Sequence, residues 1–126
     1  MIVVETGPEV LTGSTRMKAG TAIKLALNTI TTTLMIRSGR VFENLMVDLR
    51  ATNDKLKDRA ARIIATLTGM DRSHSFNLLE LADGNVKTAI VMQKLNVDKD
   101  EAERILTDKL GRLDKAIMRH SGQENG

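Results

Sequence analysis

The chain has 126 residues, a formal net charge of +3 and no cysteine. Its length corresponds to one domain, or to one small domain with a piece of another. The absence of thiols excludes disulfides, cysteine nucleophiles and thiolate metal sites, and no apolar stretch approaches the roughly 20 residues that a membrane span needs.

Location and macromolecular partners follow from the same composition. The first residues lack the basic and long apolar regions of a secretion signal, so we expect a cytoplasmic protein without membrane contact. Lys and Arg are scattered among acidic residues, and aromatic residues make up only 2% of the chain. Because a nucleic-acid surface needs a basic stripe or rings for base stacking, we expect no nucleic-acid partner.

The chain begins with a short apolar run at residues 2–4, which Gly7 and Pro8 close. This β-branched run predicts the end of a buried strand. One strand cannot satisfy its backbone groups alone, so we expect it to fray, to pair across a dimer or to pair with another chain.

Hydroxyls, glycines and two cations fill the stretch that follows, just before a helix. A helix start carries unpaired N–H groups and a positive dipole end, which suit a bound oxyanion. The stretch therefore predicts a phosphate site; a capped helix with exposed basic residues is the alternative. The candidate phosphate-binding residues are Gly13, Ser14, Thr15, Arg16 and Lys18. Glu9 is the carboxylate beside them, and we expect it to have a structural role.

Helices dominate the remainder of the sequence. Apolar residues at helical spacing predict a long helix over about residues 15–38, and residues 41–47 form an apolar connector with no clear period. A second helix is expected to begin near Asn53 and to end at Gly69, followed by a loop at residues 70–73.

The C-terminal half continues this pattern. A short helix is expected to stop at Asp83 and Gly84, and Asn85 caps the next one. Asp98, with Glu101 three residues later, resembles a capping box. The three helices between about residues 54 and 95 resemble a ubiquitin-associated-like unit. In bacterial proteins such a unit packs against its own chain more often than it binds ubiquitin.

The run from Gly7 to Ala22 closely resembles the signature of N-acetylmuramic acid 6-phosphate etherases and of their relatives, the glucokinase regulatory proteins. The similarity continues in residues 24–25, 35–37, 44–48, 51–56, 59–63 and 84–92, and so covers nearly the whole chain. It implies a mainly α chain: the C-terminal helical portion of a sugar-isomerase-type α/β enzyme.

The resemblance also implies an activity. The etherases cleave the D-lactyl ether of N-acetylmuramic acid 6-phosphate, giving N-acetylglucosamine 6-phosphate and D-lactate, by elimination and addition of water. Their catalytic carboxylates lie upstream of the signature, so we expect no catalytic residue here and an inactive fragment. In the family the loop contacts the phosphosugar, which places Ser14 and Thr15 nearest the ligand. Ile23 replaces the Gln often found in etherases and leaves the sugar unassigned.

These expectations define domains and partners. We expect residues 1–50 to end a sugar-isomerase-type domain, residues 51–120 to form a helical bundle and residues 121–126 to be a disordered tail. The expected partners are an amino-sugar 6-phosphate and either a second copy or an N-terminal α/β domain. His74 and His120 lack partners at metal-ligand spacing, so we expect no metal and no cofactor. A phosphosugar-sensing regulator and a helical oligomerisation module remain as alternatives.

Overall fold

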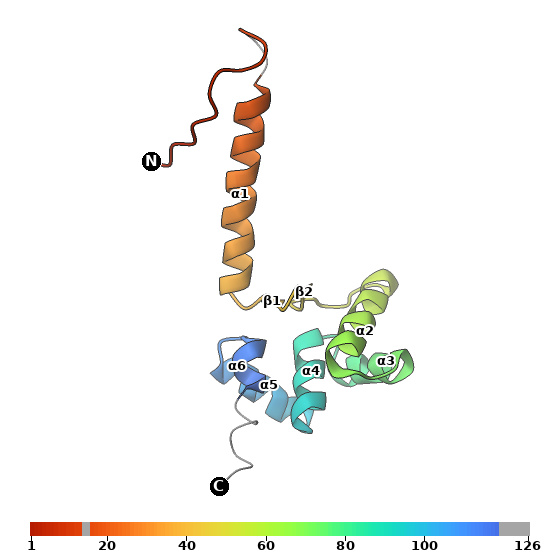
Figure 1. Ribbon diagram of the computed structural model, residues 1–126. Helices are drawn as coiled ribbons and strands as arrows, with labels where there is room; N and C mark the ends of the chain where they lie inside the picture. Colours follow the sequence, from red (N-terminus) through yellow and green to blue (C-terminus); the bar gives the residue numbers. More distant parts are fainter. Residues whose placement is uncertain (14–15, 119–126) are drawn as a thin grey trace. The chain divides into compact units, whose positions relative to one another are not determined.

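The computed structural model describes residues 1–13 and 16–118 (Figure 1). Two compact units divide the chain: the first spans Met1–Met35 and the second begins at Ile36. The described residues form six helices and one two-stranded sheet, so the prediction of a mainly α fold is confirmed. The tail expected at residues 121–126 lies outside the described residues.

The first unit consists of an N-terminal segment and helix α1 (Met17–Arg37), whose last two residues belong to the second unit. Residues 2–4 are exposed and form no strand, because no neighbouring strand in the described chain offers them backbone partners. Helix α1 has no buried residue. Its predicted apolar face therefore exists as a sequence pattern, but it is exposed.

Threonines are accommodated inside α1 by bonding back along the helix. The hydroxyls of Thr29 and Thr33 donate to the carbonyl oxygens of Leu25 and Thr29, at 2.8 and 2.7 Å. These bonds satisfy side chains that otherwise compete with the helical backbone. The polar groups of these threonines are thus satisfied inside the helix.

The second unit begins with a small antiparallel hairpin. Strand β1 (Val41–Phe42) pairs with strand β2 (Leu45–Met46), with Val41 opposite Met46 and Phe42 opposite Leu45. Glu43 takes a left-handed conformation with φ of 54° to close the turn between them. The connector for which the sequence predicted no period is thus a hairpin whose strands are too short for alternation to be visible.

Five helices follow the hairpin. They are α2 (Asp54–Thr68), α3 (Arg72–Leu81), α4 (Val86–Leu95), α5 (Lys99–Asp108) and α6 (Leu113–Ile117). In Figure 1, α2 and α3 lie beside α4 on one side and α5 and α6 on the other, and each of the four contacts α4. Every residue from Val86 to Val91 is buried, so α4 is the centre of the core.

The caps predicted at Asn53, Asn85 and Asp98 are confirmed, and the Glu101 carboxylate, expected to complete a capping box with Asp98, accepts from Arg104. The side chain of Asn53 accepts from the Leu56 N–H at 2.9 Å, and Asp98 accepts from the Glu101 N–H at the same distance. Asn85 caps α4 in the same way. The loop expected at residues 70–73 is shorter than predicted, because Asp71 caps α3 and the helix begins at Arg72. Such bonds join residues three apart and are therefore visible in the sequence.

Candidate functional site

The start of α1 is where the sequence predicts a phosphate site. There the carboxylate of Glu9 accepts hydrogen bonds from the backbone N–H groups of Lys18 and Ala19, each at 3.1 Å. The Lys18 ammonium donates to the carbonyl oxygen of Pro8 at 3.0 Å. The N–H groups of Ala19 and Lys18 lower the pKa of Glu9 below its ordinary value. The chain's own carboxylate therefore caps this helix end, which is the structural role expected of Glu9.

The other predicted phosphate-binding residues are only partly described. Ser14 and Thr15 lie outside the described residues. Gly13 has a φ of +110° and open space around the position of a side chain, and Arg16 is exposed. The assignment of a phosphate site to Gly13, Ser14, Thr15, Arg16 and Lys18 stays a prediction.

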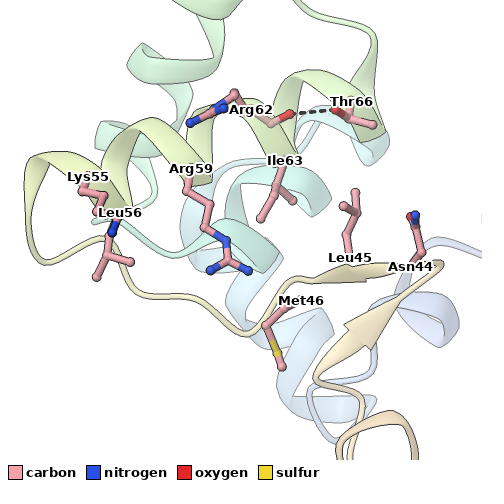
Figure 2. A pocket seen from close by; sticks show the side chains of 9 residues that line it. All are labelled: Asn44, Leu45, Met46, Lys55, Leu56, Arg59, Arg62, Ile63 and Thr66. Carbon is pink, nitrogen blue, oxygen red and sulfur yellow. Dashed lines mark hydrogen bonds between the residues drawn. The ribbon is translucent and has the colours of Figure 1, made fainter. Parts of the chain in front are cut away.

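A second candidate site lies in the second unit, between helix α2 and the β1–β2 hairpin. It is a pocket of about 460 Å³ (Figure 2). Its lining residues are Asn44, Leu45, Met46, Lys55, Leu56, Arg59, Arg62, Ile63 and Thr66. The hairpin supplies the first three, and one face of α2 supplies the other six.

One part of this pocket is apolar. Leu45 and Ile63 face each other across it, and Arg59 extends from α2 toward Met46 (Figure 2). Ile63 is buried and Leu45 is half-buried, so both belong to the edge of the core. The pocket thus combines an apolar wall with cationic groups, which is a common composition for a site that orients a small polar ligand.

The three cations differ in how they are paired. Arg62 donates to the carboxylate of Asp58 at 2.6 Å, and Asp58 also binds Arg72. No ion pair or hydrogen bond joins the side chain of Lys55 or Arg59 to another residue of the described chain. Lys55 and Arg59 are therefore the cations available to an incoming anion.

The lining chemistry supports binding rather than proton transfer. None of the nine lining residues is an acid or a histidine. A guanidinium and an ammonium both donate charge-assisted hydrogen bonds to phosphate or carboxylate oxygens and stay protonated at neutral pH. The pocket can hold an anion by these bonds, but it carries no group poised to take up a proton.

Sequence reasoning missed this cationic pocket. Lys55, Arg59 and Arg62 follow one another at spacings of four and three, which places them on one side of a helix. Read along the chain, they are interrupted by Lys57, Asp58 and apolar residues and look scattered. Helical spacing was the signal that could have found them, but the apolar wall from the hairpin was not visible without the fold.

The described residues contain neither a cluster of metal-ligand side chains nor a membrane-spanning helix. No group of three or more His, Cys, Asp or Glu side chains gathers at a point within the described residues. His74 lies beside Asp71 on the surface, whereas His120 falls outside the described residues. None of the described helices combines the length and apolarity needed to cross a bilayer.

Comparison with known proteins relates this chain to a family. No family model matches it. It is 53% identical over 92% of its length to the N-acetylmuramic acid 6-phosphate etherase 1 of Bacillus licheniformis, and 51% identical over 92% to the etherase of Bacillus subtilis. The chain is related in sequence to the N-acetylmuramic acid 6-phosphate etherases.

The relationship concerns only part of these etherases. The chain spans 38% of the length of the two Bacillus proteins. It spans 32% of the corresponding etherase of a Synechococcus strain, to which it is 54% identical over 80% of its own length. This partial coverage agrees with the expected similarity to the C-terminal portion of an etherase.

Proposed function

We propose that this chain is the phosphosugar-binding helical part of an N-acetylmuramic acid 6-phosphate etherase. The proposal rests on two cationic side chains, Lys55 and Arg59, which have no ion-pair partner in the described chain and line the pocket beside an apolar wall. They occur in a chain that is 53% and 51% identical to two proteins named for that substrate. The sequence similarity suggests the substrate, and the pocket offers the positive charge and the apolar surface that a phosphorylated sugar can use.

The substrate carries a phosphate on the sugar and a carboxylate on its lactyl ether. Lys55 and Arg59 hold one of these anions by charge-assisted hydrogen bonds. Leu45 and Ile63 pack against the C–H groups of the ligand and exclude water from those bonds. Asn44 and Thr66 supply uncharged hydrogen-bonding groups at the edge of the pocket.

Ether cleavage itself requires an acid and a base, which this pocket does not contain. In the proposal these groups come from a separate α/β domain, and the chain works with that domain or as a homo-oligomer in the cytoplasm, in recycling of cell-wall sugars. The exposed apolar side chains of α1 support such a covering partner. On its own the chain binds the sugar phosphate and releases no D-lactate.

Titration of the chain with N-acetylmuramic acid 6-phosphate, followed by amide NMR shifts, tests the proposal. We expect shifts at Asn44–Met46 and along the pocket face of α2. Lys55→Gln should weaken binding about tenfold, the loss of one charge-assisted contact. Lys57→Gln is the matched control, because Lys57 is exposed on the same helix and does not line the pocket.

Two outcomes would contradict the proposal: no shift at the pocket, or equal weakening by Lys55→Gln and Lys57→Gln. Shifts at Gly13 and Lys18 would separately support the phosphate site predicted at the start of α1. Preference for fructose 6-phosphate would favour the second candidate, a phosphosugar-sensing regulator. That candidate is supported by the same absence of acidic and imidazole groups from the pocket lining.

A further inference from the structure

Lys87 is unusual in being buried. Among the described residues it is the only charged residue that is buried, with 8% of its surface exposed, and it lies in the first turn of α4. Removing an ammonium group from water is unfavourable unless other groups replace its hydration. Its Nζ donates to the carbonyl oxygen of Gly111 at 2.9 Å and lies 3.1 Å from the carboxylate of Asp48. These two partners replace part of the hydration that the ammonium group loses on burial.

Asp48 connects this buried charge to the base of the hairpin. Its other carboxylate oxygen lies 3.5 Å from Nε of Arg40, the residue before β1. The carbonyl oxygen of Arg40 accepts from the N–H groups of Val47 and Asp48, at 3.0 and 3.3 Å. The two ends of the hairpin are thus tied together at the carboxylate that Lys87 binds.

The two walls of the pocket are both held by α4, in different ways. Helix α2, which carries Lys55 and Arg59, packs directly against α4. The hairpin supplies Asn44–Met46 to the opposite wall. The ion pair between Asp48 and Lys87 links it to α4, next to Val47, which is buried in the same core as α4. Apolar burial is non-directional and tolerates several positions of the hairpin, whereas an ion pair with fixed partners favours one position.

We propose that Lys87 is a positioning residue for the cation-lined pocket. Acting through Asp48, it sets the hairpin wall at the distance from α2 at which an anion held by Lys55 and Arg59 also contacts Leu45 and Met46. This inference rests on the proposed function for the role of the pocket. The placement of the hairpin by Lys87 can be tested without any ligand.

The test uses the whole 126-residue chain and Lys87→Met, which keeps most of the aliphatic stem and removes the charge. We expect the dissociation constant for N-acetylmuramic acid 6-phosphate to rise about tenfold. The methyl NMR signal of Met46 should move, and amide exchange at Val47 and Asp48 should become about tenfold faster. Lys94→Met, at an exposed position of the same helix, should change none of these.

A purely structural role would instead accelerate exchange throughout the core, including the amide of buried Ile64 in α2. If Lys87→Met does not fold, Asp48→Asn replaces it, because the Asp48 side chain is 43% exposed and carries the same link. An unchanged Met46 methyl signal with unchanged exchange at Val47 and Asp48, in either folded variant, overturns the inference. Absence of ligand binding by the unmodified chain overturns the proposed function, and the ligand-free measurements then still decide whether Lys87 positions the hairpin.

Discussion

Helices α1 and α4 differ in what their apolar residues do. Both contain Ile, Leu, Val or Ala in most turns, yet α1 has no buried residue in 21 and α4 has seven in 10. Helix α1 is held by its backbone bonds and by the Glu9 carboxylate at its start. Helix α4 is held by packing against α2, α3, α5 and α6. Apolar content therefore does not decide burial here; the number of neighbouring elements does.

The largest expected effect tests this contrast directly. Ile64→Ala removes a side chain with no exposed surface and should lower the free energy of unfolding by about 2–5 kcal/mol. Leu27→Ala in α1 should change it by less than about 0.5 kcal/mol, because Leu27 is exposed. Urea unfolding measures both. A comparable loss for Leu27→Ala would show that another surface covers α1 in solution.

Two glycines with the same backbone conformation sharpen the comparison. Gly39 and Gly7 have φ of +70° and +67°, but a Cβ on Gly39 would lie 2.9 Å from Cγ of Arg112, whereas Gly7 has open space. We expect Gly39→Ala to cost about 2 kcal/mol, from left-handed strain and displacement of Arg112. Gly7→Ala should leave thermal unfolding of the second unit unchanged. Equal losses of stability for Gly39→Ala and Gly7→Ala would mean that the left-handed backbone strain, and not the contact with Arg112, causes the loss.

The cap of α4 should have a smaller effect. The side chain of Asn85 accepts from the Thr88 N–H at 3.2 Å, so Asn85→Ala should lower the free energy of unfolding by about 1 kcal/mol. Thermal denaturation monitored by circular dichroism measures the loss. Asn85→Asp keeps a capping oxygen and should recover most of it; failure to do so would point to another role for the amide.

The smallest expected effect is a local pH dependence at the start of α1. The pKa of Glu9 is lowered in the folded chain by the N–H groups of Ala19 and Lys18. The stabilisation that the Glu9 carboxylate gives to the start of α1 is therefore fully present above the ordinary carboxyl pKa of 4.5. It is lost as the pH falls through the lowered pKa. Below that pH the Lys18 and Ala19 amides should exchange faster. In Glu9→Gln this dependence should vanish, and a pH profile that stays the same would contradict the assignment.

The sequence by itself determined the local features of this protein. The helix starts at Asn53, Asn85 and Asp98 were predictable, because a capping side chain bonds a backbone N–H three residues away. The end of α2 at Gly69 was predictable because glycine adopts the left-handed conformation without strain. The relation to etherases was also readable, because it resides in runs of contiguous residues.

Only the tertiary structure decided which residues meet across the chain. The pocket needs Asn44–Met46 opposite Lys55 and Arg59, and the burial of Lys87 needs Asp48 and Gly111. These partners are separated by turns and whole helices, and their meeting depends on the packing around α4. The exposure of α1 was likewise invisible in its sequence, because an apolar face predicts a surface to be covered and does not supply the element that covers it.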